Sequence, residues 1–328
     1  MKTLLTGEAN WIFYPEGEMV KDKKIVEKTR YLISSAGGKR PPHTGAAVLA
    51  LRTEFYRQRL ARMAETDTGE AMRLMEKFRI DSIEPVLARK TWIVPVNITY
   101  YPLRAHENAL SRLADHLVKD LSQRSREEII TEGTMLLSGV DIDIHFGAPI
   151  AVNECLECSP IDLDIFAMGK LDFDDPIRSR RKMRQVAVDS MRQYMAAIYG
   201  MTTVNHDHLF ASMLQALPFA GIDEDNLKRR VFLVTIEKLE LMGVHLHRSL
   251  RTSQVSLLTD DRFNKYRDFI NLAIEKKIVK KKGDRLIRNT ALFSSPLDFS
   301  RARIDNPVAV IANEVVPLQQ LQRKIRSI

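Results

Sequence analysis

Residues 140–146 read Val-Asp-Ile-Asp-Ile-His-Phe, and this stretch indicates the class of fold most directly. Its even-numbered residues are apolar and its odd-numbered residues are polar or charged. A period of two is typical of a β-strand that buries one of its faces. Gly147 and Pro149 follow at once and end the strand. We therefore predict a half-buried strand here.

Two earlier segments also predict strands. Residues 91–101 are rich in β-branched and aromatic side chains, with Pro95 marking an edge or a bulge. Residues 10–14 (Asn-Trp-Ile-Phe-Tyr) form a short apolar run that suits a buried strand. Helical spacing over 43–63 and over 105–121 separates these strands. Strands alternating with helices predict an α/β layer for the first ~150 residues.

The remainder of the chain has a different pattern. An aspartate-rich loop occupies residues 159–176, and from about Pro176 onward the spacing is mainly helical. We place the domain boundary in this loop, with one domain over residues 1–158 and a mainly α-helical domain over 176–328. One face of the first long helix is marked by Met183, Val186, Met191, Tyr194, Met195 and Ile198.

A helix followed by a hairpin is predicted near the C-terminus. Residues 261–277 have helical spacing, and the apolar pairs Ile278-Val279 and Leu286-Ile287 flank a Lys-Gly-Asp turn. This order suggests a winged-helix-like unit. The lysine run 280–282 at the hairpin would contact nucleic-acid phosphates, although a small structural hairpin explains the same residues.

The amino-acid composition limits the class of binding partner and the cellular compartment that we expect for this protein. The 328 residues are 45% hydrophobic and 28% charged, with a formal net charge of +8 that favours anionic partners. The absence of a secretory leader and the two cysteines, Cys155 and Cys158, favour a reducing, cytoplasmic location. No apolar run reaches the ~20 residues that span a bilayer, so membrane contact would be peripheral.

Two further clusters have a functional and a structural interpretation. Cys155-Leu156-Glu157-Cys158 has the spacing of half a zinc site or a redox pair, but no second pair exists, so we expect two incidental thiols and no metal. The basic run Arg178–Arg184 would rest on anionic lipid headgroups, and a solvated helix face explains it nearly as well.

Several segments, in order, resemble one enzyme family. Phe13-Tyr14-Pro15-Glu16-Gly17 resembles the third sequence block of the glycerol-phosphate and lysophosphatidate acyltransferases. Residues 43–51 resemble the Lys-x-Gly-x-x-x-x-Ala segment of that family, and Ile93-Val94-Pro95-Val96 resembles its fourth block. Residues 145–150 are similar to its closing Phe-Gly-x-Pro-Ile phrase. The resemblance covers roughly residues 9 to 151.

The resemblance implies transfer of an acyl group from a thioester, of coenzyme A or of acyl-carrier protein, to a glycerol-phosphate-type acceptor, without a further cofactor. The residues that match the acceptor pocket are Pro15, Glu16, Gly17 and Pro95. Met19 stands where the family has an arginine, so Lys21, Lys23 and Lys24 are the candidates for a substitute phosphate contact. A solvated basic loop explains these lysines as well.

The family's general base is a histidine in a His-x4-Asp block upstream of Pro-Glu-Gly. No histidine of this chain has an aspartate five residues later, so the sequence assigns no catalytic residue. We expect an N-terminally truncated domain, inactive alone, with a partial acyltransferase-type sheet that exposes an edge and apolar surface. A companion chain would then carry the missing segment. The alternative is a noncatalytic protein that binds anionic lipid or nucleic acid through its basic helix and hairpin.

Overall fold

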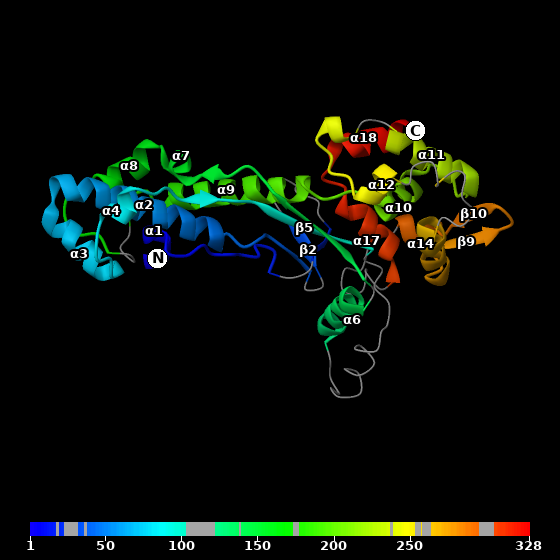
Figure 1. Ribbon diagram of the computed structural model, residues 1–328, viewed down its shortest axis with the longest axis horizontal. Coiled ribbons are helices and arrows are strands. Elements are labelled where there is room, and N and C mark those ends of the chain that lie inside the picture. The colour runs from blue at the N-terminus through cyan, green and yellow to red at the C-terminus, as the bar shows by residue number, and fades with distance from the viewer. Residues whose placement is uncertain are drawn as a thin grey trace. The chain divides into compact units, whose positions relative to one another are not determined.

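The computed structural model (Figure 1) describes residues 1–17, 20–22, 32–35, 38–102, 122–137, 139–172, 177–236, 239–252, 257, 264–294 and 305–328. The chain is a mixed α/β protein with many helices and small sheets. The helix expected over 105–121 lies entirely outside the described residues.

Two compact units make up the chain. Unit 1 comprises residues 1–17, 42–95 and 146–197, and unit 2 comprises residues 18–41, 96–145 and 198–328. Both units are therefore built from separated stretches of sequence. The division into domains at 1–158 and 176–328 stays a prediction.

Unit 1 is a set of helices around one long helix. The helix expected over 43–63 is confirmed as α2 (Gly45–Thr66), which packs against its neighbours through a buried face that includes Leu51, Phe55 and Leu60. The other elements of unit 1 are α1 (Lys2–Thr6), α3 (Thr68–Phe78), α4 (Glu84–Leu87), β4 (Trp92–Ile93), β7 (Ile150–Ala151), α7 (Val152–Leu156), α8 (Ser159–Ile165) and α9 (Arg180–Gly200), which belongs to this unit up to residue 197.

The prediction of a buried strand over residues 10–14 is wrong. These residues are extended but belong to no sheet, and Trp11, Ile12, Phe13 and Tyr14 are all exposed. The indole of Trp11 stacks on the ring of Phe13 and donates a hydrogen bond to Oγ1 of Thr3, 3.2 Å away. Apolar composition alone does not make a strand, because a strand needs a neighbour for its backbone N–H and C=O groups.

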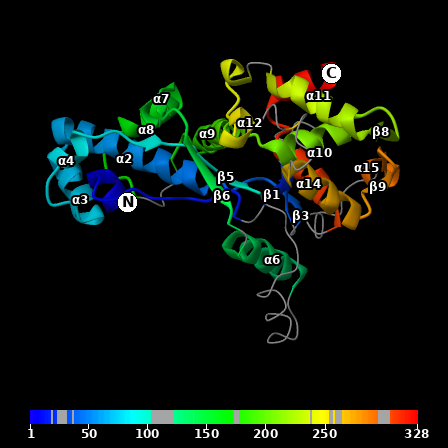
Figure 2. The ribbon, with the colours of Figure 1, turned by 45° about the vertical axis from the view of Figure 1, so that its right-hand side comes forward.

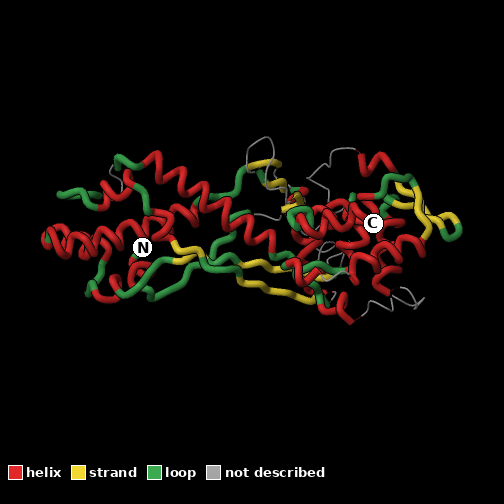
Figure 3. The backbone as a smooth tube through the Cα atoms, turned by 90° about the horizontal axis from the view of Figure 1, so that it is seen from above, coloured by secondary structure: helices red, strands yellow, loops and turns green. Residues whose placement is uncertain are grey.

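The sequence predicts a buried strand over residues 91–101. Strands are present on both sides of an interruption at Pro95, but Trp92, Val94 and Ile98 are exposed, so the segment is not buried throughout. Its first part is β4, which pairs antiparallel with β7 through Trp92 opposite Ala151 and Ile93 opposite Ile150. Its second part is β5 (Val96–Tyr101), which pairs with β6 (Asp141–Phe146) in a separate sheet. Figure 3 shows β5 and β6 as two long neighbouring strands.

Unit 2 contains a helical core with two further small sheets (Figure 2). In one of them β2 lies between β1 and β3, and both pairings are antiparallel. Besides β5 and β6, the elements are β1 (Val20–Asp22), β2 (Ile33–Ser35), β3 (Gly38–Arg40), α6 (Gln123–Leu137), α10 (His206–Ala216), β8 (Gly221–Asp223), α11 (Glu224–Ile236), a 3₁₀ helix (Leu239–Met242), α12 (Arg248–Thr252), α14 (Asn264–Glu275), β9 (Val279–Lys282), β10 (Arg285–Arg288), α15 (Thr290–Ser294), α17 (Pro307–Glu314) and α18 (Gln319–Ser327).

The helix and hairpin predicted near the C-terminus are both present, as α14 and the β9–β10 pair. The hairpin extends to a three-stranded antiparallel sheet in the order β8-β10-β9. Helix α10 lies at the centre of the unit, where it packs against α11, α14, α17 and α18. The core that these helices share includes Phe210, Leu214, Phe269 and Leu286.

The strand predicted over residues 140–146 is confirmed as β6, but its buried face is the opposite of the expected one. Ile142 and Ile144 are 58% and 53% exposed, whereas Asp141, Asp143 and His145 are half-buried. Strand β5 repeats the inversion. Its polar residues Asn97 and Thr99 are buried and Ile98 is exposed. The two strands therefore turn a polar face toward the rest of unit 2 and leave the apolar side chains of the other face exposed to solvent.

A capping box starts α10. The side chain of Asn205 accepts a hydrogen bond from the backbone N–H of His208, 3.0 Å away, and Nδ1 of His208 accepts one from the N–H of Asn205. Replacement of Asn205 by Ala removes an N-cap, which costs about 1 kcal/mol. We expect Asn205→Ala to lower the free energy of unfolding of the protein in urea by about that amount.

Asn205→Ser provides the matched control, because a serine hydroxyl also accepts a hydrogen bond at this position. It should unfold close to the wild type. Equal unfolding of Asn205→Ala and the wild type would contradict the assigned cap.

Candidate functional site

The Pro-Glu-Gly turn is held firmly within unit 1. Gly17 has a φ of 65°, and its N–H donates to the carbonyl of Tyr14 at 3.0 Å, which closes a tight turn. The carbonyl of Pro15 accepts from the N–H of His43 at 2.9 Å. The hydroxyl of Tyr194 donates in turn to the carbonyl of His43 at 3.1 Å. The turn is thus anchored to the start of α2.

Pro95 lies where two segments of the resemblance meet. Pro95 is buried, and its carbonyl accepts a hydrogen bond from the N–H of Gly147 at 2.8 Å. This bond and the β4–β7 ladder join residues 92–95 to residues 147–151. Among the described residues, no hydrogen bond or ion pair joins Pro95 to the Pro-Glu-Gly turn.

The lysines predicted as phosphate contacts receive less support. Lys21 lies on β1, where its side chain is not described, and Lys23 and Lys24 lie outside the described residues.

The structure describes both cysteines of the Cys-x-x-Cys segment. Cys155 and Cys158 are free and half-buried, and the thiol of Cys155 contacts the carbonyl of Ala151 at 3.6 Å.

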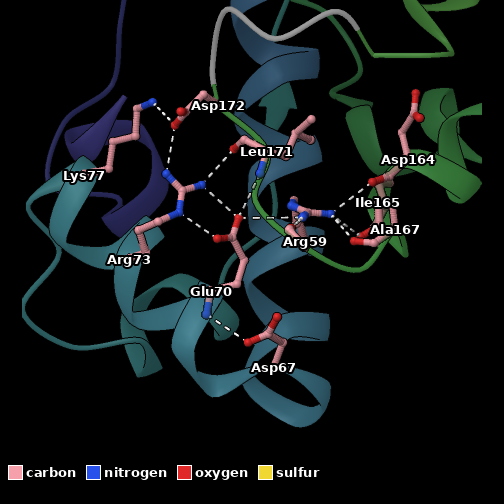
Figure 4. A network of polar contacts seen from close by, with 11 residues as sticks. Arg59, Asp67, Glu70, Arg73, Lys77, Asp164, Ile165, Ala167, Leu171 and Asp172 are labelled. Carbon is pink, nitrogen blue, oxygen red and sulfur yellow. Dashed lines mark hydrogen bonds and ion pairs between the residues drawn. The ribbon is translucent and has the colours of Figure 1, made fainter.

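A dense charge network in unit 1 serves the fold (Figure 4). The buried guanidinium of Arg59 donates to the carbonyls of Asp164, Ile165, Ala167 and Gly169. The Arg59 guanidinium also forms an ion pair with the buried carboxylate of Glu70, which takes two hydrogen bonds from Arg73 at 2.6 and 2.9 Å.

The network also perturbs the acidic groups. Burial alone would raise the pKa of Glu70, but the hydrogen bonds from Arg73 and Leu171 and the nearby Arg59 charge lower it. Hydrogen bonds from Lys77 and Arg73 lower the pKa of Asp172 to about 2. Each of these charged groups is paired with another group of the network. The network therefore holds α2, α3 and the chain after α8 together.

The densest group of titratable side chains lies in unit 2, where two His-x-His segments meet. Val204 and Leu246 form a parallel β-bridge, with Val204 N–H bonded to the carbonyl of His245 and His247 N–H bonded to that of Val204, both at 2.8 Å. This bridge brings the start of α10, with His206, near residues 247–249. We call His145, His206, His245, His247, Asp141 and Ser249 the histidine cluster.

A chain of polar contacts runs through the cluster. Nε2 of His247 lies 3.3 Å from Oδ2 of Asp141, and Nδ1 of His247 lies 2.8 Å from Oγ of Ser249. The backbone N–H of Ser249 also donates to Nδ1 of His247, so this nitrogen is an acceptor and Nε2 carries the proton. Oγ of Ser249 reaches onward to Nδ1 of His206 at 3.3 Å.

His145 joins the cluster from β6. Its Nε2 lies 2.9 Å from the hydroxyl of Thr203, and its ring stacks on that of His245 with centroids 4.0 Å apart. The N–H of Thr203 in turn donates to the hydroxyl of Thr99 on β5 at 3.1 Å. These contacts explain why the polar face of β5 and β6 is the buried one.

Burial disfavours the charged imidazoles of the cluster. Burial, followed by the nearby His145, lowers the pKa of His245. The pKa of His247 is also lowered, because burial outweighs the opposing effect of Asp143 and Asp141, and Lys265 adds to the lowering. The cluster has the groups of a proton relay, but Ser249 and His247 are buried. We assign it a structural role.

The sequence carried a signal for this cluster that the resemblance did not use. His206-Asp207-His208 and His245-Leu246-His247 are two His-x-His pairs, and residues 141–145 alternate acidic and apolar side chains before a fifth histidine. In the extended segment around Leu246, a spacing of two places His245 and His247 on one side, whereas His206 and His208 lie in the first turn of α10. Only the tertiary structure brings the pairs together.

A second cluster is confirmed as exposed. Arg178, Arg180, Arg181 and Arg184, at the start of α9, line a shallow depression of about 620 Å³ with Gln185 and Val188. The face predicted for this helix is buried at Val186, Met191, Tyr194 and Met195, so the arginines lie in water at its first turns.

Comparison with protein-family models, with curated proteins and with solved structures finds no match to this chain. Within the described ranges, no three or more His, Cys, Asp or Glu side chains are arranged to hold a metal ion. The helices of that part of the chain include none with both the length and the apolar character required to cross a bilayer.

The histidine cluster predicts a pH dependence of stability. Because the folded-state pKa values of His245 and His247 lie below the ordinary value of 6.5, the unfolded chain takes up protons first as the pH falls. Their contribution is therefore complete above pH 6.5 and is lost progressively below it. We expect the melting temperature to fall over this range, as measured by circular dichroism.

His247→Asn separates this effect from general acid denaturation. An asparagine at this position, directly before α12, accepts the Ser249 N–H hydrogen bond without titrating. The variant should show a shallower pH dependence of the melting temperature than the wild type. An unchanged slope in His247→Asn would contradict the assignment.

Proposed function

We propose that the chain is part of a glycerolipid acyltransferase that transfers a fatty acyl group from a thioester donor to a glycerol-phosphate-type acceptor. The observation that carries the proposal is the pairing of residues 92–95 with residues 147–151. These are the two segments that resemble the fourth block and the closing phrase of the family, and they lie more than 50 residues apart in sequence. If both segments line one wall of the acceptor pocket, they must lie side by side, and their pairing meets this requirement.

The exposed apolar face in unit 2 gives further support. Ile98, Ile142 and Ile144 lie on one side of the β5–β6 pair and are exposed, while the other side is packed. In the proposal, further strands of an acyltransferase sheet cover this face, because a contiguous apolar face is costly to leave in water.

The chemistry needs a general base that this chain does not supply at the matching position. In the proposal a His-x4-Asp segment, on a companion polypeptide or further upstream in the same one, takes the proton from the acceptor hydroxyl as it attacks the thioester. Pro15, Glu16, Gly17 and Pro95 shape the acceptor pocket. We place the protein in the cytoplasm, peripheral to the membrane, with coenzyme A or acyl-carrier protein as the carrier of the acyl group.

Acceptor binding tests the proposal without requiring turnover. Isothermal titration with glycerol 3-phosphate should show saturable binding, because the acceptor pocket belongs to this chain. Glu16→Ala should weaken it about tenfold, the effect of losing a hydrogen bond from a charged group. Glu8→Ala removes an exposed carboxylate from the same unit and should have no effect.

Turnover is the second arm of the same experiment. Addition of a polypeptide that carries the His-x4-Asp and arginine blocks of a glycerolipid acyltransferase, together with a long-chain acyl-CoA, should produce lysophosphatidate. Absence of glycerol 3-phosphate binding, or equal binding by Glu16→Ala, would contradict the proposal.

A second function is favoured by the order of elements in unit 2. Helix α10, strand β8, helices α11 and α14, and strands β9 and β10 follow one another, and the sheet order is β8-β10-β9. We propose a winged-helix-type unit whose hairpin presents the exposed Lys280 and Lys282 to nucleic-acid phosphates. Lys281 is instead paired with Glu224 at 2.5 Å.

Salt-dependent binding of duplex DNA tests this second function. The wild type should bind in fluorescence anisotropy with an affinity that falls steeply as salt rises, because phosphate contacts release counterions. Lys280→Glu with Lys282→Glu should abolish the binding, whereas Glu8→Ala should not change it. Salt-independent binding, or no effect of the lysine substitutions, would exclude the hairpin as a nucleic-acid contact.

A further inference from the structure

The start of α9 presents four exposed arginines. Arg178, Arg180, Arg181 and Arg184 are all exposed and line the depression of about 620 Å³. Arg180 and Arg184 are four residues apart, and Arg181 and Arg184 are three apart, so these side chains are neighbours on the helix surface. Like charges at this spacing repel each other, which disfavours the arrangement unless an anion lies between them.

Other arginines of unit 1 contrast with this group. Arg73 pairs with Glu70 and Asp172, Arg62 pairs with Glu65, and Arg192, further along α9, pairs with Asp189. None of the four arginines at the start of α9 forms an ion pair with any part of the chain that the structure describes. Their fork of N–H donors is therefore available to an external phosphate group.

Exposed apolar side chains lie on the segment that adjoins the arginines. The carboxylate of Asp164 accepts hydrogen bonds from the N–H groups of Arg178 and Ser179, at 3.3 and 2.7 Å. Leu163 directly precedes Asp164 and is 66% exposed, and Met168 is 67% exposed. Large apolar side chains left in water beside a basic cluster are typical of a face that enters the interfacial region of a membrane.

We propose that the α9 arginines and the exposed residues Leu163 and Met168 form a docking face for an anionic phospholipid bilayer. The arginines bind the phosphates of the headgroups, and the apolar side chains enter the boundary between headgroups and acyl chains. The depression is shallow and lined by side chains of one helix and its preceding turn, which suits an extended surface of many phosphates better than a single enclosed ligand. This inference stands on unit 1 alone and is independent of acyl transfer.

Vesicle co-sedimentation of the full chain tests the docking face. The wild type should sediment with phosphatidylcholine vesicles that contain phosphatidylglycerol and stay in solution with phosphatidylcholine alone. Arg181→Glu with Arg184→Glu should weaken the binding at least about tenfold, because each basic side chain near an anionic surface contributes on the order of fivefold. Arg181→Lys with Arg184→Lys should retain most of the binding.

Two matched variants identify the cause. Arg323→Glu with Arg326→Glu on α18 makes the same change in net charge at exposed positions of unit 2 and should leave vesicle binding within about twofold of the wild type. Leu163→Ser with Met168→Ser should weaken vesicle binding without lowering the melting temperature. If the charge-reversed arginine variant melts early, Arg181→Gln with Arg184→Gln takes its place.

Three results would overturn the proposal. The first is equal vesicle binding by the wild type and the arginine variants. The second is an equal loss in the Arg323 and Arg326 variant, which would reduce the effect to net charge. The third is saturable binding of inorganic phosphate or pyrophosphate without any vesicle binding, which would assign the arginines to a soluble ligand.

Discussion

The polar contacts that bury one face of the β5–β6 pair determine how unit 2 uses these strands. Asn97 and Thr99 on β5, and Asp141 and His145 on β6, bond to residues 198–203 and 247–248. Each of these groups would cost free energy if it were buried without a partner, so the contacts form as a set. Because successive side chains of a strand point to opposite faces, this choice forces Ile98, Ile142 and Ile144 outward.

In unit 1, buried arginine side chains satisfy the hydrogen-bonding groups of the backbone. Arg57 and Arg59 are buried on α2, and each donates to several carbonyls at the ends of short elements in addition to pairing with one carboxylate. Backbone carbonyls at such ends lack partners in their own helix, and a guanidinium satisfies several of them at once. Polar pairing therefore fixes the loops around α2.

The sequence predicted the existence of many elements better than their surroundings. Helices α2, α9 and α14 and strands β5, β6, β9 and β10 follow from residue periodicity, because that period is a local property of the chain. The buried face of β6 was not predictable, since it depends on Thr203 and His247, far along the sequence. The strand predicted over residues 10–14 was wrong for a similar reason. A strand needs a distant segment to pair with, and no strand in the described part of the chain pairs with these residues. The Pro-Glu-Gly turn and Pro95 were placed from resemblance, and the histidine cluster escaped notice because its pairs meet only in the fold.

Thiol labelling tests the inverted β5–β6 pair most directly. In a background with Cys155→Ser and Cys158→Ser, the single substitutions Ile142→Cys and Asp143→Cys place one thiol on each face of β6. We predict that a thiol at position 142 reacts nearly as fast as in the unfolded chain, whereas a thiol at position 143 is protected until the protein unfolds. Protection at 142 with rapid reaction at 143 would contradict the account, because the apolar face would then be the buried one.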